Sequence, residues 1–357
     1  MNAKLIEEIA NAVLYEGYML YPYRPSSVKN RQRWNFGVVY PQSHSEAQSG
    51  ADNWFMQTEC LAKAGSNLEL RVKVRFLQAV ARTIGELKTP LENAPLPGSG
   101  HEPEFATVES LRMGDKTLQS WQEAIEREIV LPTITIKDRR VAECASLVDF
   151  PGGREFEPVR DADGHVAALI IRTKETISAR VEASVTRIND ELLKVAVRIV
   201  NSTESKKIDA ANREGALMQS LLSAHTILSV QGGEFISVID PPEPLKEAVA
   251  ECKNIGTWPV LAGEAGQRDG MLSSPIILYD YPQIAPESPG DLFDGTEIDE
   301  ILALRILTLT DEEKHEMRHA DERARQILER TEAMPAEHFM KLHGVLRGLR
   351  PADGGQQ

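Results

Sequence analysis

The chain has 357 residues, a length that suits two or three compact units. Hydrophobic residues make up 41% and charged residues 26%, a balance that is typical of globular proteins and excludes a chain that is disordered throughout. The net charge of −14 argues against general nucleic-acid binding, because contacts with phosphate need a positive surface.

Residues 1–54 are predicted to form a helix followed by a segment rich in aromatic and basic residues. Leu5, Ile9, Ala12 and Val13 fall on one helix face, and Asn2 can cap the helix. The aromatic and basic residues that follow could stack on a single-stranded nucleic acid or anchor a packed loop. The acidic remainder of the chain disfavours nucleic acid, so we treat the segment as a partner-binding candidate. Its candidate residues are Tyr21, Tyr23, Arg24, Arg33 and Trp34.

Residues 55–208 are predicted to form an antiparallel β domain. Apolar and polar residues alternate over 68–77 and again over 177–187, the pattern of strands with one buried and one solvent-facing side. A turn at Asn189 and Asp190 leads to a partner strand over 193–199. We expect a sandwich-like sheet whose solvent-facing side carries a basic stripe at Arg71, Lys73 and Arg75.

Residues 209–350 are predicted to form an α/β domain with a helical end, followed by a flexible tail at 351–357. Helices are expected over 212–222, 241–253, 310–332 and 335–347, and short strands over 258–261 and 276–279. Gly232 and Gly233 separate two apolar runs and predict a hairpin. The predicted fold class is therefore α+β: an antiparallel β-sandwich-like domain with an N-terminal helix and an α/β C-terminal part ending in helices.

One motif points to metal chemistry. The run from His315 to His319 fits the H-E-x-x-H pattern, in which His315 and His319 would bind zinc and Glu316 would activate water. Charged residues flank the motif on both sides, whereas a catalytic zinc helix normally packs in the floor of a cleft. No third ligand has a compelling spacing, so we favour a solvated helix with chance histidine spacing and keep a zinc-dependent hydrolase or peptidase as the alternative.

An acidic segment follows the stretch 273–281 and contains no lysine or arginine up to residue 300. Three interpretations are open: the carboxylates complement the dipole of the following helix, dock on a basic partner, or bind a divalent cation. The candidate partner-binding residues of this region are Tyr279, Asp280, Tyr281, Glu287, Asp291 and Asp294.

Two motifs carry a resemblance to a known family. They are the stretch 15–24, with Lys29-Asn30 and Arg33-Trp34 after it, and the stretch 273–281 followed by 285–300. Both resemble an uncharacterised bacterial family encoded in gene clusters for actinobacterial-type, oxygen-tolerant [NiFe] hydrogenases. The resemblance implies an accessory role in maturation or assembly of the hydrogenase, with hydrogenase subunits or maturation factors as partners. It carries over no catalytic residue.

The remaining residue patterns favour a non-enzymatic scaffold or chaperone. Cys60, Cys144 and Cys252 are far apart, which argues against a disulfide framework, a structural zinc site or an iron–sulfur centre. No nucleophile elbow, phosphate loop or dinucleotide fingerprint occurs. We expect no cofactor. No apolar run approaches the roughly 20 residues of a membrane span, and the first residues do not resemble a signal peptide, so we expect a cytoplasmic protein.

The charge is unevenly distributed along the chain. Residues 1–100 carry 11 basic and 9 acidic side chains, whereas residues 209–357 carry 13 basic and 26 acidic ones. This asymmetry predicts an interaction protein with a basic N-terminal part and an acidic C-terminal part.

Overall fold

The computed structural model describes residues 3–15, 36–92, 103–114, 116–137, 140–204 and 212–283, and isolated residues between 306 and 333. These residues fall into two compact units, one reaching to residue 283 and the other beginning after it. All the strands and named helices belong to the first unit.

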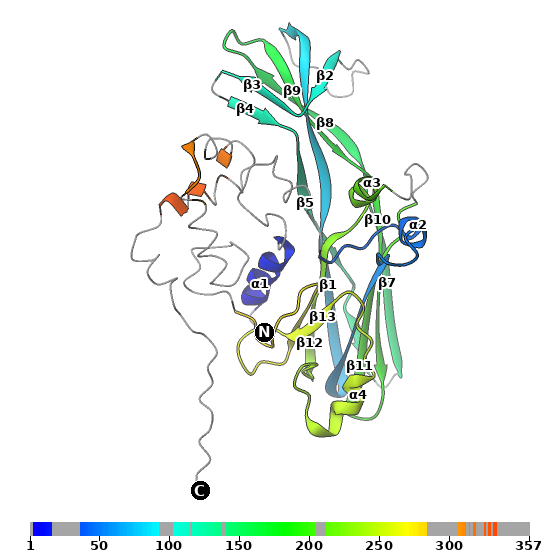
Figure 1. Cartoon of the computed structure of the whole chain (residues 1–357). Helices are drawn as coiled ribbons and strands as arrows, with labels where there is room; N and C mark the ends of the chain where they lie inside the picture. Colours follow the sequence, from blue (N-terminus) through cyan, green and yellow to red (C-terminus); the bar gives the residue numbers. More distant parts are fainter. Residues whose placement is uncertain are drawn as a thin grey trace. The chain divides into compact units, whose positions relative to one another are not determined.

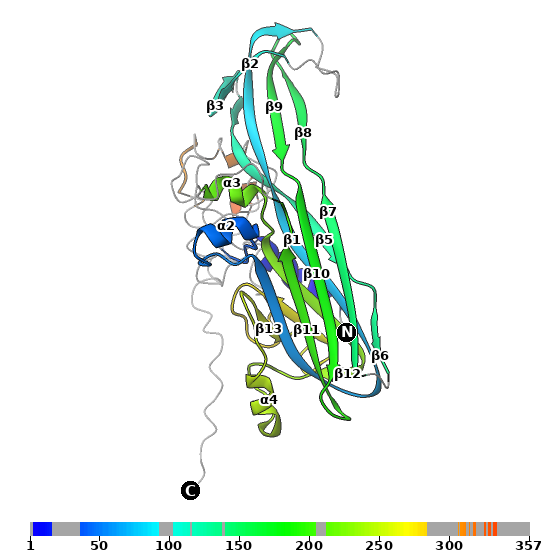
Figure 2. The same cartoon turned by 90° about the vertical axis from the view of Figure 1, so that its right-hand side faces the viewer.

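A single curled sheet of 12 antiparallel strands makes up most of the first unit (Figures 1 and 2). Its central strand, β1 (Phe55–Leu91), is 37 residues long and pairs with six other strands. The other strands of the sheet are β2 (Phe105–Val108), β5 (Trp121–Val130), β6 (Ile134–Ile136), β7 (Val141–Phe150), β8 (Gly153–Arg160), β9 (Val166–Lys174), β10 (Ile177–Arg187), β11 (Leu192–Asn201), β12 (Leu222–Phe235), β13 (Trp258–Leu261) and β14 (Gly270–Ser274). Two further strands, β3 (Ser110–Met113) and β4 (Lys116–Gln119), form a separate pair.

The helices of this unit are short and lie around the sheet (Figure 1). They are α1 (Ala3–Tyr15), α2 (Gln42–Ala47), α3 (Arg213–Met218), the 3-10 helix η2 (Glu243–Leu245) and α4 (Lys246–Ala250). The N-terminal helix is confirmed, but its buried residues are Ile6, Ile9, Ala10, Val13 and Leu14, with Leu5 and Ala12 only half-buried.

The main core lies inside the curl of the sheet. Strand β10 buries its odd-numbered residues and pairs with β11 across the predicted turn, so these two predicted strands are confirmed. The curl brings β7 over the middle of β1, where the ring of Phe150 meets the ring of Phe76 with 5.3 Å between the centroids. The guanidinium of Arg127 lies over the Phe150 ring, 5.3 Å from its centroid. The sheet therefore closes over its own apolar side chains.

A two-sided arm continues from the far end of β1 and occupies the upper part of Figure 1. It consists of β2, β8 and β9 with the β3–β4 pair. Small apolar clusters around Ile84 and around Leu87 cover its two faces. Charge pairs between strands also connect the arm: the Arg172 guanidinium of β9 lies 2.7 Å from Glu123 of β5 and 2.6 Å from Glu157 of β8.

The predicted α+β fold class is wrong. The described residues are mostly antiparallel strand with few helical residues, and β12, β13 and β14 join the same sheet as β1. A short apolar run in the sequence has the same pattern whether its strand belongs to a separate α/β domain or to an existing sheet. The difference lies in which strand it pairs with, and that is decided by distant residues.

Two local corrections follow from that pairing. The expected hairpin around Gly232 and Gly233 is one strand, β12, which runs straight through both glycines along β1. The expected strand over 276–279 is an extended segment outside the sheet, and the strand lies earlier, as β14. The other predicted short strand, 258–261, is confirmed as β13.

Candidate interaction surface

Helix α1 forms the frame on which the candidate surface is built. It packs on β12 and β14 through Ile6, Ile9, Ala10 and Val13, which meet Ile227 and Leu272 of the sheet. Ser223 fixes the end of the helix, since its hydroxyl donates to the Val13 carbonyl at 3.0 Å. The apolar stripe at helical spacing in the sequence is thus the reason why α1 lies flat on these strands.

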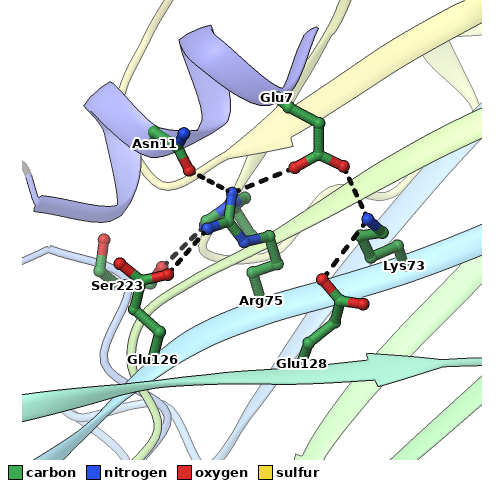
Figure 3. Close-up of polar contacts among 8 residues, drawn as sticks. Glu7, Asn11, Lys73, Arg75, Glu126, Glu128 and Ser223 are labelled. Carbon is green, nitrogen blue, oxygen red and sulfur yellow. Dashed lines mark hydrogen bonds and ion pairs between the residues drawn. The ribbon is translucent and has the colours of Figure 1, made fainter. Parts of the chain in front are cut away.

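A network of charged side chains fastens α1 to the sheet (Figure 3). Glu7 of α1 lies 2.6 Å from the Lys73 ammonium and 3.3 Å from the Arg75 guanidinium. Arg75 also donates to Asn11 at 2.7 Å and to Glu126 at 3.2 Å. Burial opposes the charge of Lys73, but Glu7 and a second carboxylate on β5 outweigh it and raise the pKa of Lys73.

This network corrects the predicted basic stripe. Arg75 is 7% exposed and lies beneath α1, and Lys73 is half-buried. Both are matched by carboxylates of α1 and β5, so neither offers free positive charge to a partner. Only Arg71 of the three is exposed.

His225 lies beside Arg75 in the pairing of β1 with β12 and is fully buried. Its Nδ1 donates to the Ser223 carbonyl at 3.0 Å, and its Nε2 has no hydrogen-bond partner among the described residues. Burial lowers the pKa of His225 to about 4, and the positive charge of Arg75 acts in the same direction. The imidazole is therefore neutral at physiological pH.

The segment after β14 carries the most exposed apolar side chains of the described residues. Ile276 and Leu278 pack toward the cluster under α1, whereas Ile277 and Tyr279 are 74% and 83% exposed. This alternation is that of an extended chain with one face on the protein. The exposed pair, Ile277 and Tyr279, is the candidate interaction surface.

Asp280 and Tyr281 hold this segment in place. The Asp280 carboxylate accepts from the Ser237 hydroxyl at 2.5 Å and from the backbone N–H of Leu261 at 2.8 Å. The Tyr281 N–H donates to the Leu261 carbonyl at 2.7 Å, and Tyr281 adopts a φ of 57°, which is uncommon for a residue with a side chain. The outer edge of β13 is thus covered, and Ile277 and Tyr279 project from a fixed segment.

Of the predicted partner-binding residues, the structure describes three, and it gives them different environments. Tyr279 is exposed, Asp280 is engaged with Ser237 and Leu261, and Tyr281 packs against the main core. The other predicted residues lie outside the described ones: Tyr21, Tyr23, Arg24, Arg33, Trp34, Glu287, Asp291 and Asp294.

The predicted metal motif also lies outside the described residues, since His315, Glu316 and His319 are not among them. Lys314 and Arg318, beside and within this stretch, are described and lie 3.3 Å and 2.7 Å from Glu332. Burial disfavours ionisation of Glu332, but the hydrogen bonds from Arg318 and Lys314 outweigh it and lower its pKa. Within the described ranges, no three His, Cys, Asp or Glu side chains gather as a cation site would require.

A small polar pocket that the sequence pattern did not indicate lies beside the segment that leads into β1. It has a volume of about 180 Å³ and is lined by Tyr40, Asp52, Asn53 and Arg213 among others. His44 lies 3.2 Å from the Asp52 carboxylate and stacks on the Tyr40 ring at 4.9 Å. Burial raises the pKa of Tyr40, so its phenol stays protonated. Arg213 is far from the other three lining residues in the sequence, and the four belong to no recognised motif, which is why spacing alone could not single them out.

Comparison with known proteins adds no relationship: no protein-family model matches the chain, and no curated protein matches it in sequence. None of the helices in the described part of the chain is both long and apolar enough to cross a membrane.

Proposed function

We propose that this protein is a non-enzymatic accessory factor for the maturation or assembly of a [NiFe] hydrogenase, acting in the cytoplasm as an interaction scaffold or chaperone. The link to hydrogenase rests on the family resemblance of residues 15–24 and 273–300. The interaction role rests on one structural observation: Ile277 and Tyr279 are 74% and 83% exposed on a segment that Asp280 holds against β13.

The chemistry of this surface favours a protein partner with an apolar and basic face. An isoleucine and a tyrosine held in place offer apolar area and a phenol without a large ordering cost. In the sequence, the residues after 283 add six carboxylates up to residue 300 and no basic side chain. A partner with basic residues around an apolar pocket would match both features.

The test is a native pull-down from cells that express the hydrogenase, with a tagged wild-type protein and the double variant Ile277→Asn, Tyr279→Ser. We expect the wild type to recover hydrogenase subunits or maturation factors. The double variant is expected to recover about tenfold less, because it loses two central apolar contacts. Ile239→Asn is the matched control, because Ile239 is 50% exposed elsewhere. If the wild type recovered neither hydrogenase subunits nor maturation factors, the proposed function would be contradicted. If the double variant recovered as much partner as Ile239→Asn, the assignment of the surface to Ile277 and Tyr279 would be contradicted.

A further inference from the structure

The longest path of paired strands in the main sheet ends at β13 on one side and at β7 on the other, and these two ends differ. The edge of β13 is protected, because Pro259 has no N–H and the N–H of Leu261 is bound by Asp280. Strand β7 is ten residues long and contains no proline, lysine or arginine. Figure 2 shows β7 along the margin of the sheet.

The free side of β7 can be assigned residue by residue. Arg187 of β10 donates its N–H to the carbonyl of Arg140 at 2.8 Å, so the even-numbered positions turn their backbone groups toward β10. Backbone groups alternate along a strand, so the odd-numbered positions turn theirs outward. Among the described residues, no strand pairs with this outward side. The outward positions, which are also exposed, are Val141, Glu143, Ala145, Leu147 and Asp149.

We propose that β7 pairs with β7 of a second copy of this chain, antiparallel about a two-fold axis at Ala145. This arrangement continues the sheet across the axis and forms hydrogen-bonded pairs at all five outward positions. Ala145 then faces Ala145 of the other copy, Glu143 faces Leu147, and Val141 faces Asp149. Both large apolar side chains that β7 leaves exposed, Val141 at 44% and Leu147 at 64%, gain a neighbour.

Charge selects this alignment over its neighbours. A two-fold axis at Ser146 would place Glu143 opposite Asp149, and an axis at Glu143 would place that carboxylate opposite itself; like charges directly opposite each other destabilise a strand pair. An axis at Cys144 or at Leu147 avoids opposed carboxylates but leaves at least one outward position of β7 without a strand partner. The axis at Ala145 avoids opposed carboxylates and uses the whole strand.

Arg180 provides a complementary charge at the same interface. It pairs with Leu147 in the ladder between β10 and β7 and is exposed. In the proposed dimer, Leu147 in turn faces Glu143 of the second copy, so Arg180 and that carboxylate lie in one row on the outer face of the continuous sheet. Arg180 already pairs with Glu182 in its own strand, and the dimer offers it a second carboxylate.

Cysteine cross-linking tests the alignment. In a background with Cys144→Ser and Cys252→Ser, Ala145→Cys is expected to form a disulfide-linked dimer on oxidation, because directly opposite residues have Cα atoms about 5.5 Å apart, within disulfide range. Leu147→Cys is the matched control on the same strand, since it faces Glu143 and is expected to stay uncross-linked. Absence of cross-linking at Ala145→Cys, or equal cross-linking of the two variants, would overturn the alignment.

The mass in solution tests the dimer itself. By sedimentation equilibrium, the wild type is expected to have twice the mass of the chain, and Ala145→Lys, which opposes two ammonium groups, is expected to have the mass of one chain. Leu147→Lys places its ammonium opposite Glu143 and is expected to remain dimeric, while circular dichroism confirms that both variants fold. A wild type that stays monomeric over the tested concentrations would overturn the proposal. A monomeric Leu147→Lys variant would do the same.

Discussion

Arg75 shows why the environment of a single residue depends on its distant neighbours. By alternation it belongs to the outward side of its strand, yet α1 covers it and leaves it 7% exposed. Burial of a guanidinium is tolerated only where its donors are matched, and Glu7, Asn11 and Glu126 match them. The position of α1 is thus coupled to a buried charge.

Removing the helix partner of this charge is expected to destabilise the fold. Glu7→Gln leaves Arg75 with Asn11 and Glu126 and takes the carboxylate from Lys73, so we expect the free energy of unfolding to fall by about 1–2 kcal/mol in a urea titration. Glu8→Gln is the control on the same helix, because Glu8 is 48% exposed and lies 3.7 Å from an exposed Lys4. We expect about 0.5 kcal/mol or less for this control, and equal losses for the two variants would contradict the role of Glu7.

At the scale of the element, β12 is continuous because two glycines allow its backbone to approach β1 closely. A Cβ at Gly233 would lie 2.6 Å from the Lys63 carbonyl oxygen and 2.7 Å from a methyl of Leu68. Gly232 has a φ of +80°, and a Cβ there would lie 2.6 Å from the Asn67 carbonyl oxygen. In the sequence, two adjacent glycines are typical of a turn, but here they mark the contact of two strands at the irregularity of β1.

Gly233→Ala is expected to lower the free energy of unfolding by about 1–3 kcal/mol, because the added methyl meets the Lys63 backbone as well as the buried Leu68 side chain. Gly153→Ala, at the start of β8, is the matched control: the nearest atom to its Cβ is the end of the Lys174 side chain at 3.7 Å. Thermal and urea unfolding of both variants measures the difference. If both variants matched the wild type, the close approach of β12 and β1 would not be a constraint.

At the scale of the whole molecule, the buried His225 makes stability depend on pH. Its pKa falls from 6.5 to about 4 on folding, so below pH 6.5 the unfolded chain binds a proton that the folded protein resists. Above pH 6.5 the neutral His225 takes nothing from the stability of the fold. As the pH falls from 6.5 toward 4, the free energy of unfolding decreases, by at most about 3 kcal/mol.

The comparison of His225→Gln with the wild type measures this dependence. Between pH 7 and pH 4, the free energy of unfolding of the wild type is expected to fall more steeply than that of His225→Gln, whatever the absolute stability of the variant. His165→Gln, at an exposed position, is expected to keep the slope of the wild type. Parallel profiles for wild type and His225→Gln would mean that His225 does not resist protonation in the folded state.

The sequence predicted those parts of the fold that depend on neighbouring residues. The alternation in β10 and β11, the turn between them, the short strand β13 and the presence of α1 are all local patterns, and each is confirmed. The fold class was wrong because the strands after residue 209 could be assigned to a sheet only through their pairing with β1 and with each other.

The candidate site divides in the same way. The sequence indicated the stretch around Tyr279 as distinctive, but it could not separate the exposed Tyr279 from Asp280, which binds the Leu261 backbone, or from Tyr281, which packs on the core. Composition and period determined that this chain is rich in amphipathic strands, because those depend on the order of residues alone. Only the tertiary structure decided which polar side chains are buried and which strand edge is open, because both depend on groups that are far apart in the sequence.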